Sequence, residues 1–286
     1  MDLSIIIVNW KVKDLLKKCL QSIFEQTKNI SFEVFVVDNA SSDGSVEMVR
    51  EKFPQVDLIA SSENLGFAKG NNLAIKKSRG RYILLLNPDT EILDNALEKM
   101  VRFMDAHLDC GISGCNLLNP DLSLQPSVRA FPNLASQAFI LLKIHHLLPH
   151  TKTIYKYLVQ NFDYEKTQEV EQVMGAFMMI RREVVDKIGL LDENFWIWFE
   201  EVDFCKRAKS AGWEILYTPE AKIIHHFGQS FKQAMGVKKQ KDFNRSLSYY
   251  FKKHETRGEW LAIQILRPLS LFLAWLAQIF VKKEPT

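Results

Sequence analysis

The chain has 286 residues, of which 47% are hydrophobic and 25% are charged, so it can bury the core of one large or two small domains. Its four cysteines form no CxxC pair and no zinc-ligand spacing, which favours reduced core thiols over a disulfide scaffold or a zinc site. The net charge of +3 is unevenly distributed, because the stretch from Lys222 onward holds 12 Lys and Arg against 4 Asp and Glu.

Apolar runs and helical periodicities alternate through the first 115 residues. Short apolar runs bounded by turn-forming residues are typical of strands buried in a parallel sheet. The links between them are short, as in wound α/β folds. We therefore predict an α/β fold with a wound, mostly parallel central sheet flanked by helices, with strands at 4–9, 33–37, 56–61, 82–86 and 110–115 and helices at 13–26, up to 52, up to 78 and 95–107.

The region from 116 to about 230 is less regular. Residues 149–170 have no clear period and are expected to form a loop or a flap. The remaining pattern predicts, in chain order, a strand at 124–131, an apolar helix at 134–148, a strand at 173–180, a turn at 186–192, a helix at 195–210 and short strands at 214–217 and 221–225.

The C-terminal segment combines positive charge with apolar residues. A basic helix is expected over 240–253, and residues 261–281 approach the roughly 20 apolar residues that span a bilayer, but Arg267-Pro268 interrupts them. We expect an amphipathic anchor in the plane of a membrane or partly inserted, with Trp275 and Lys282-Lys283 at headgroup level. The alternative is a core helix packed on the domain. Nucleic acid is not an expected partner, since no recognised binding module accompanies the charge.

The N-terminal apolar run is too short for a secretory signal, so we expect a cytoplasmic protein, peripheral on the cytoplasmic face of the membrane.

Polar side chains follow each of the first four predicted strands. In wound sheets, ligands bind beyond the carboxyl ends of the strands. Amides and carboxylates beside glycines suit hydrogen bonding to a base and a ribose, and a carboxylate oxygen suits a hard divalent ion on a diphosphate. Four such clusters in succession predict one ligand-binding crevice, formed by Asn9, by Asp38 and Asn39, by Asn64, Gly66, Lys69 and Asn71, and by Asn87 and Asp89.

The fourth cluster, in YILLLNPDT, also has good turn chemistry, because Asp89 could cap the next element. Pro88 cannot donate to a ladder, so the strand should stop by Asn87. Its place as the fourth polar strand end favours the site. Asp89 would offer oxygen to a metal, and Asn87 would make a positioning or ribose contact.

Aromatic residues surround three carboxylates in the stretch FWIWFEEVDFCKR at 195–207. If the whole stretch is helical, its apolar residues form a stripe, Glu200 points almost opposite that stripe and Glu201 flanks it. A carboxylate beside aromatic rings should have a raised pKa, as a general base needs, so Glu201 is the candidate base. Asp203 is a further candidate, although it can instead form an ion pair with Arg207 four residues later.

His225, in IIHHFGQS, ends a predicted strand and could be a metal ligand or only a hydrogen-bonded partner. The signatures GxGxxG, GxxxxGK[ST], HExxH and GxSxG are missing from the sequence, so dinucleotide, P-loop, zinc-protease and serine-hydrolase chemistry lack their usual support.

Seven motifs, taken in their order along the chain, resemble those of the family-2 nucleotide-sugar glycosyltransferases with the GT-A fold, particularly the rhamnosyltransferase-like bacterial members. The resemblance covers about residues 3–230. It implies a GT-A domain at 1–230, with a nucleotide-binding half at 1–115 and an acceptor and catalytic half at 116–230, followed by a basic helical extension at 231–286. The motifs are SIIIVNW, VVDNASSDGS, NLGFAKGNN, LLLNPDT, MGAFMMIRR, GLLDENFWIWFEEVDFCKRAKSAGW and IIHHFGQS.

The resemblance implies metal-dependent, inverting transfer of a sugar, rhamnose being one candidate, from a dTDP- or UDP-sugar to a hydroxyl of a lipid-linked or polysaccharide acceptor in cell-surface glycan synthesis. In such an enzyme a metal neutralises the departing diphosphate while a base deprotonates the acceptor. By motif position, Asp38 would hold the pyrimidine base, with Asn9 and Asn64 nearby. Asp89 would bind Mg²⁺ or Mn²⁺, with His225 as accessory ligand. Glu201 would accept the proton of the acceptor hydroxyl.

Two positions depart from the family pattern. Asn87 stands where the first Asp of the metal-binding DxD motif is expected, which leaves Asp89 with more of the metal binding. Glu201 stands where the base is usually Asp, and the extra methylene keeps Glu200 as an alternative base.

Two other functions were weighed. A sugar-1-phosphate nucleotidyltransferase would need a Gly-rich phosphate loop after the first strand, which Asn9-Trp10-Lys11 does not supply. A non-catalytic sugar-nucleotide-binding module is disfavoured because Asp89 and the Glu200-Glu201 pair are both present.

Overall fold

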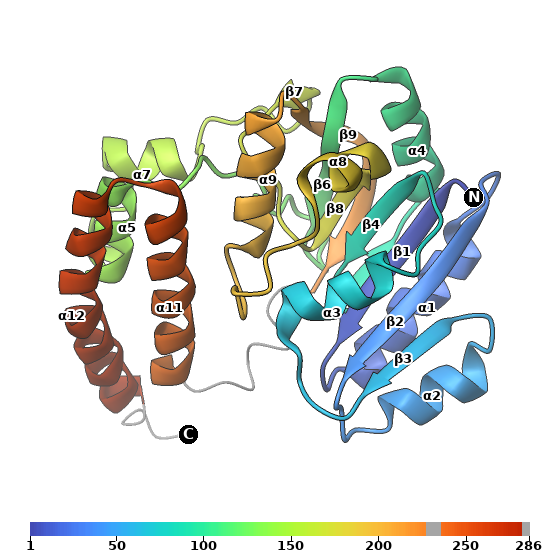
Figure 1. The fold of residues 1–286 in the computed structure, drawn as a ribbon, viewed down its shortest axis with the longest axis horizontal. Coiled ribbons are helices and arrows are strands. Elements are labelled where there is room, and N and C mark those ends of the chain that lie inside the picture. The colour runs from blue at the N-terminus through green and yellow to red at the C-terminus, as the bar shows by residue number, and fades with distance from the viewer. Residues whose placement is uncertain (227–235, 282–286) are drawn as a thin grey trace.

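The computed structural model describes residues 1–226 and 236–281, so the predicted Lys282-Lys283 pair and the end of the IIHHFGQS motif lie outside the described residues. A mixed sheet forms the centre of the molecule, with the strand order β3-β2-β1-β4-β8-β6-β9-β5 and β7 paired to β9. Helices flank this sheet, and a group of helices lies to one side of it (Figure 1).

The first half of the sheet is parallel, as predicted. It consists of β1 (Leu3–Asn9), β2 (Phe32–Asn39), β3 (Asp57–Ser61) and β4 (Tyr82–Leu86). The register of β1 and β2 pairs Asn9 with Asp38, so the ends of these two strands lie side by side. Because β1 and β4 also pair in parallel, the polar residues after these strands lie at one edge of the sheet.

The second half is mixed. Strand β8 (Phe177–Arg181) runs antiparallel to both β4 and β6 (Cys110–Leu118), and β9 (Glu214–His225) pairs in parallel with β6. The short strands β5 (Thr90–Ile92) and β7 (Gln168–Glu169) are antiparallel to β9. Strand β5 pairs Thr90 with His225, so the segment after β4 meets the end of β9.

Two hydrophobic cores sandwich the sheet because side chains alternate along each strand. In β1, Leu3, Ile5 and Ile7 face one core, and Ile6 faces the other. The first core contains α1 (Lys13–Gln26), α2 (Ser45–Lys52) and α4 (Ala96–Ala106), and the second contains α3 (Gly66–Ile75), α8 (Arg182–Ile188) and α9 (Glu200–Ser210).

The group of helices at the side consists of α5 (Leu134–Leu141), α6 (Ile144–Leu147), α7 (Lys152–Tyr157), α11 (Gly236–His254) and α12 (Arg257–Val281) (Figure 1). A third core joins it to the start of α9, with Phe199 and Val202 packed against Leu247 and Tyr250. The structure therefore provides the basic helical extension predicted from the sequence and places α11 against a predicted catalytic helix.

Several predicted elements differ from the structure. Residues 124–131 form isolated bridges instead of a strand, and the predicted helix 134–148 breaks at Lys143, whose φ is 59°. The predicted loop 149–170 contains α7 and β7. Helix α8 extends into the start of the predicted turn at 186–192 and ends at Ile188, and the two predicted strands at 214–225 are one strand with an irregular register. Helix α12 continues through Pro268 instead of stopping there.

Candidate active site

The ends of β1 and β2 form one polar corner. Asn9 and Asp38 are both buried, and Nδ2 of Asn9 donates to Oδ1 of Asp38 at 2.8 Å. The other Asp38 oxygen accepts from the backbone N–H of Ser41 at 2.8 Å, and Ser41 Oγ accepts from the backbone N–H of Lys11. Oδ1 of Asn9 is buried with no hydrogen-bond partner among the described residues. A buried acceptor costs free energy unless something donates to it, so this oxygen is suited to a ligand N–H or O–H.

The segment before α3 is fastened to the same corner. Nδ2 of Asn39 donates to the carbonyl of Gly66 at 3.1 Å, and Oδ1 of Asn64 accepts from the N–H of Gly66 at 2.9 Å. Gly66 has a φ of 77°, and a Cβ added there would lie 2.6 Å from the Trp196 carbonyl oxygen. Glycine is therefore required here both by the backbone conformation and by the close approach of the 195–199 segment.

Helix α3 carries the other two predicted donor-binding residues. Asn71 is buried, donates from Nδ2 to the Phe67 carbonyl at 2.9 Å, and has an Oδ1 without a partner in the part of the chain that the structure describes. Lys69 lies on the exposed side of the same helix. Asn71 thus adds a second buried acceptor near the strand ends, and Lys69 offers a mobile positive charge at the surface.

The residues after β4 are positioned by their backbone. The Asn87 N–H donates to the Ala176 carbonyl at 3.0 Å, and the Asn87 carbonyl accepts from Thr90 Oγ1 at 2.8 Å. The bond from Thr90 closes the turn that the turn chemistry of this stretch predicts, and the bond to Ala176 leaves Asn87 beside the 175–176 segment. The turn and the site are therefore compatible.

Asp89 and His225 come together although they are far apart in the sequence. Both are buried, and His225 Nε2 lies 3.4 Å from Asp89 Oδ1. The side-chain nitrogen of Gln125 donates to Asn119 Oδ1 at 2.8 Å and to the His225 carbonyl at 3.2 Å, so its Oε1 must accept from His225 Nδ1 at 2.7 Å. With Nδ1 donating to Gln125, a neutral imidazole carries its lone pair on Nε2, the nitrogen that lies 3.4 Å from Asp89 Oδ1.

These two side chains fit a divalent cation. Carboxylate oxygen suits both Mg²⁺ and Mn²⁺. A histidine that binds a metal through one ring nitrogen is commonly oriented by a hydrogen bond at the other, as Gln125 provides for His225. Within residues 1–226 and 236–281, no group of three or more His, Cys, Asp or Glu side chains could hold a metal ion by itself. Asp89 and His225 would therefore need further ligands from a bound diphosphate or from water.

Glu200 and Glu201 begin α9, directly after two residues with left-handed backbones, Trp198 (φ 64°) and Phe199 (φ 70°). The helix that was predicted to begin at Phe195 therefore starts at Glu200. For this reason Glu200 does not point away from the apolar residues as the helical projection indicated, but is buried with 3% of its surface exposed.

Both carboxyl groups have a buried Oε2 without a hydrogen-bond partner among the described residues. Burial raises the pKa of Glu201, as predicted, and the pKa of Glu200 lies well above its usual range because of burial and the neighbouring charge of Glu201.

Glu201 also adjoins the donor-side residues. A Cβ placed on Gly175 would lie 3.7 Å from Cβ of Glu201 and 3.7 Å from the ring of Phe67. Gly175 is the neighbour of Ala176, which accepts from Asn87, and Phe67 is the neighbour of Gly66. The segment 175–176 therefore links the carboxylate pair, the residues after β4 and the start of α3.

A family model described as "Glycosyl transferase family 2" matches residues 4–189. The chain belongs to glycosyl transferase family 2. It is 24% identical over 243 residues to N-acetylglucosaminyl-diphospho-decaprenol L-rhamnosyltransferase of Mycobacterium tuberculosis, covering 80% of this chain and 77% of that protein. It is also 25% identical over 233 residues to rhamnosyltransferase WbbL of Escherichia coli, covering 78% and 82%. The protein is thus a glycosyltransferase.

A solved structure confirms the GT-A fold. The mannosyltransferase PcManGT from Pyrobaculum calidifontis, in complex with GDP-Man and Mn²⁺, superposes with a TM-score of 0.59 at 16% identity, covering 99% of this chain and 76% of that one. The fold predicted from the motif order is therefore the fold of this glycosyltransferase.

Asp203, the third candidate catalytic carboxylate of the glycosyltransferase, lies in a buried ion network. It is fully buried, and it accepts from Arg207 Nε at 2.8 Å, from Lys253 Nζ at 2.7 Å and from His254 Nε2 at 2.6 Å. Burial alone would raise its pKa, but the hydrogen bonds from His254 and Lys253 and the charge of Arg207 lower it. The ion pair with Arg207 that the spacing allowed is present, and both Asp203 oxygens are occupied.

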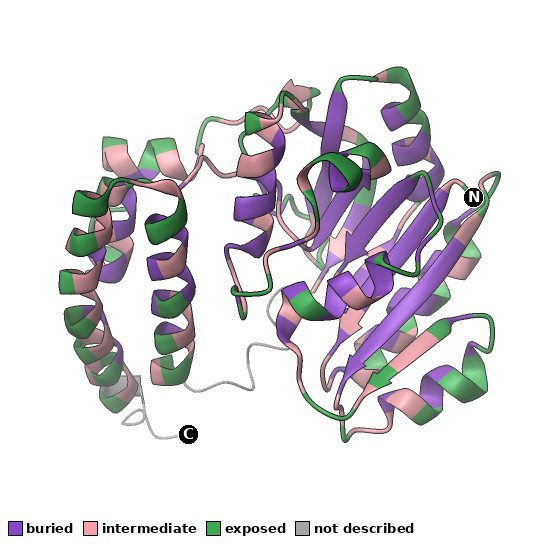
Figure 2. Ribbon diagram, in the orientation of Figure 1, coloured by how far each residue is buried: buried purple, intermediate pink, exposed green. Residues whose placement is uncertain are grey.

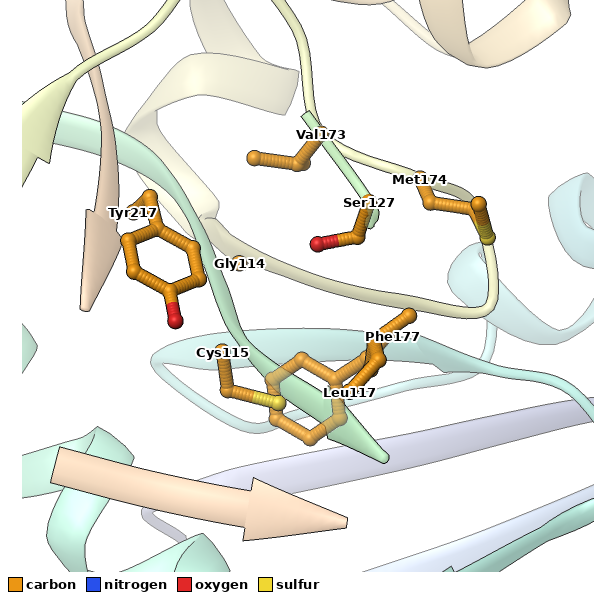
Figure 3. Close-up of a pocket in the computed structure, with 8 residues that line it drawn as sticks. All are labelled: Gly114, Cys115, Leu117, Ser127, Val173, Met174, Phe177 and Tyr217. Atoms are coloured by element: carbon orange, nitrogen blue, oxygen red, sulfur yellow. The ribbon is translucent and has the colours of Figure 1, made fainter. Parts of the chain in front are cut away.

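A small cavity lies between β6, β8 and β9, with room for about one water molecule. Figure 3 shows that most of the side chains around it are apolar, among them Met174, which precedes Gly175 in the chain. It is far too small for a nucleotide sugar. Its lining residues are Gly114, Cys115, Leu117, Ser127, Val173, Met174, Phe177 and Tyr217.

Sequence analysis missed three positions that hold the site. Gln125 orients His225, Ser41 connects Asp38 to the backbone after β1, and Asn72 ties α3 to the segment before α9 by accepting from the Leu191 N–H at 3.2 Å. Ser41 and Asn72 both lie within the motifs named above, VVDNASSDGS and NLGFAKGNN. Gln125 had no signal, because its partner is 100 residues away.

Proposed function

We propose that this protein is a metal-dependent, inverting glycosyltransferase that moves a sugar from a dTDP- or UDP-sugar to an acceptor hydroxyl. The observation that carries the proposal is the convergence at segment 175–176, which brings a buried carboxylate of raised pKa beside the residues that follow β4. A base next to a diphosphate site is what a single displacement at an anomeric carbon requires.

The donor is held by the polar strand ends. Asp38 and Asn9 are fixed by each other and by Ser41, so Asn9 Oδ1 can accept from the imide N–H of a uracil or thymine ring without reorganisation. Asn64, Asn39 and Gly66 shape the loop before α3, where the ribose would lie. Asn71 and Lys69 contribute from α3, the first through its buried Oδ1 and the second through its positive charge.

Asp89 and His225 would hold Mg²⁺ or Mn²⁺, with Asn87 positioning the adjoining backbone. When bound, the cation supplies positive charge that stabilises the departing nucleoside diphosphate. Gln125 keeps the imidazole of His225 in the tautomer whose Nε2 can act as a ligand.

Glu201 is the proposed general base. Its buried Oε2 has no partner within the described part of the chain and can accept the acceptor O–H. As oxygen attacks the anomeric carbon from the face opposite the diphosphate, the O–H proton passes to Glu201 and the bond to the diphosphate breaks, so the configuration inverts. Glu200, the buried neighbour of Glu201, is the alternative base.

The acceptor we propose is a lipid-linked glycan on the cytoplasmic face of the membrane. The Mycobacterium tuberculosis relative is named for a diphospho-decaprenol substrate and for L-rhamnose, and the Escherichia coli relative is a rhamnosyltransferase. Rhamnose is therefore the first donor sugar to test.

The outer face of α12 supports peripheral membrane association. This helix is long and apolar enough to cross a membrane between Arg257 and Ile279, but its opposite face packs against α11 and contains a buried Ser270 that accepts from Asn244 Nδ2 at 2.7 Å. The exposed side chains repeat every three or four residues and so occupy one face of the helix. They are Leu261, Ile265, Leu269, Phe272, Trp275 and Ile279. Figure 2 shows exposed positions recurring along α12.

We therefore favour a helix that lies in the plane of an anionic bilayer over one that spans it. Exposed basic residues on the same pair of helices, such as Lys238, Lys241 and Arg257, add attraction to anionic lipid. In a flotation assay with vesicles containing phosphatidylglycerol, the wild type should float and the double variant Ile265→Glu/Phe272→Glu should not. Leu108→Glu, at an equally exposed leucine in the sheet domain, should float like the wild type.

The test of the reaction is a panel of nucleotide sugars incubated with a polyprenyl diphosphate-linked glycan, with Mg²⁺, Mn²⁺ or EDTA. The proposal expects acceptor-dependent release of nucleoside diphosphate, abolished by EDTA, and a product of inverted configuration. Release of pyrophosphate from a nucleoside triphosphate and sugar phosphate would indicate a nucleotidyltransferase instead. Binding without turnover across the panel would indicate a non-catalytic module.

A further inference from the structure

Helix α11 contacts the segment that leads into the catalytic carboxylates. Ser246 Oγ, which is buried, donates to the carbonyl of Ile197 at 2.8 Å. The Tyr249 hydroxyl donates to Asp192 Oδ2 at 3.0 Å and accepts from Asn194 Nδ2 at 3.2 Å. Two hydroxyl groups one turn apart on α11 thus hold both ends of the 192–197 segment.

The residues between this segment and α9 have an unfavourable backbone. Trp198 and Phe199 are both left-handed, a conformation that bulky side chains rarely adopt unless surrounding structure imposes it. The surrounding structure is again α11, since the Phe199 ring lies 5.4 Å from the Phe243 ring and 5.6 Å from the Tyr250 ring. Glu200 follows directly, so the direction in which α9 leaves this turn depends on those contacts.

One turn into α9, a third contact fixes the same two helices. Lys253 Nζ bridges Asp203 Oδ1 and Asp192 Oδ2, each at 2.7 Å, and His254 donates to Asp203 as well. The bond from Lys253 to Asp192 is exposed, but Asp203 itself is fully buried, and removing a partner from a buried carboxylate costs more than breaking a surface pair. Asp203 is therefore a positioning residue of α9, held from the C-terminal extension.

We infer that α11 is a brace that sets the position of Glu201, so that the C-terminal extension is part of the catalytic apparatus as well as a membrane-binding element. The inference rests on the proposed function, because Glu201 acts as the base there. It assigns positioning roles to Ser246 and Tyr249, which belong to no sequence motif described above. Neither residue is expected to touch either substrate.

The test uses the full-length protein and the variants Ser246→Ala and Tyr249→Phe, singly and together. Each removes one hydroxyl and leaves the aromatic and aliphatic packing in place. The matched control is Ser248→Ala, which removes a hydroxyl on the same helix that accepts from Trp260 and Gln264 of α12 instead.

The brace predicts a fall in kcat of about ten-fold or more in the double variant, since displacing a catalytic group by about 1 Å can cost on the order of 10²-fold. Binding of UDP or dTDP with Mn²⁺, measured by calorimetry, should stay within about two-fold, because the donor residues lie on β1, β2 and α3. Ser248→Ala should keep the wild-type kcat.

A second readout is specific to positioning. The groups that share the Glu201 environment are Glu200 on α9, Cys205 on the next turn and Tyr157 on α7. Loosening the brace admits water, which lowers the pKa of a buried carboxyl toward its ordinary value, so the acid limb of the kcat profile should move to lower pH.

A double variant with wild-type kcat and an unchanged pH profile would overturn the inference, as would a loss of kcat matched by an equal loss of nucleotide affinity. If the wild type transfers no sugar from any donor, the proposed function fails, and this inference fails with it. If the wild type is active and the variants have no effect, the inference about α11 is wrong and the proposed function stands.

Discussion

Replacing Glu201 by Gln is the most informative single change in this glycosyltransferase. Glutamine has nearly the same volume and shape, so the packing against Gly175 and Phe67 should persist. The change removes the one property that the proposed base needs, which is the ability to take a proton. Because Oε2 has no hydrogen-bond partner among the described residues, the substitution breaks no bond there.

The expected loss of activity follows from the proposed role of Glu201 as a general base. General base catalysis typically contributes about 10² to 10⁴ in rate, equivalent to roughly 3 to 5 kcal/mol of activation free energy. The free energy of unfolding of the variant should increase at alkaline pH although its activity falls. A carboxyl whose folded pKa is raised destabilises the native state as pH rises through the interval between its unfolded and folded pKa values. Glu201→Gln should therefore be as stable as the wild type at acid pH and more stable at alkaline pH.

The assay is nucleoside diphosphate release with saturating donor and acceptor, alongside thermal unfolding at several pH values. Glu214→Gln is the matched control, because Glu214 is an exposed glutamate at the start of β9. The control should keep full activity and show no such pH-dependent gain in stability. Near-wild-type turnover by Glu201→Gln would refute the base assignment and direct attention to Glu200.

Three further changes test other parts of the site. Asp89→Asn should weaken Mn²⁺ binding in the presence of UDP, seen by electron paramagnetic resonance, and abolish transfer without unfolding the protein. Gln125→Leu should raise the metal concentration for half-maximal activity by about 10- to 100-fold, because it removes the hydrogen bond that orients His225; an unchanged requirement would argue against His225 as a ligand. Gly66→Ala should destabilise the fold by about 1 to 3 kcal/mol in chemical denaturation, because of its positive φ and the clash with the Trp196 carbonyl; a smaller effect would mean that the 195–199 segment moves freely.

The sequence was most informative where local periodicity determines structure. The strands β1, β2 and β4 are short apolar runs, and their polar ends come together because parallel neighbours end at the same edge. Asp89 and His225, which the family resemblance assigned to one metal ion, lie with Oδ1 and Nε2 3.4 Å apart. The motif order was sufficient for the fold, because seven stretches in one order constrain the topology far more than any single stretch.

The errors occur where tertiary contacts override local pattern. The residues before Glu200 have good helical periodicity, but α11 holds Trp198 and Phe199 in left-handed conformations and delays the start of the helix. Similarly, Pro268 lacks an N–H, yet α12 continues through it because its inner face is packed on α11. Neither effect is visible in a window of consecutive residues.

The contacts of α11 with the proposed catalytic segment were also beyond sequence reasoning. Ser246 and Tyr249 look like ordinary polar positions on a basic helix, and their partners lie 49 and 57 residues earlier in the chain. Only the folded arrangement shows that the predicted extension and the predicted catalytic half share a core.

We propose that the protein transfers a sugar from a nucleotide donor, with Glu201 as the base next to a donor site built around Asp89 and His225. The most direct test is the release of nucleoside diphosphate by the purified wild type from a dTDP- or UDP-sugar with Mn²⁺ and a lipid-linked glycan. The claim predicts release that requires all three components, with a glycosylated lipid formed in equal amount. Release that is unaffected by chelating the metal, or no release with any donor in the panel, would contradict it.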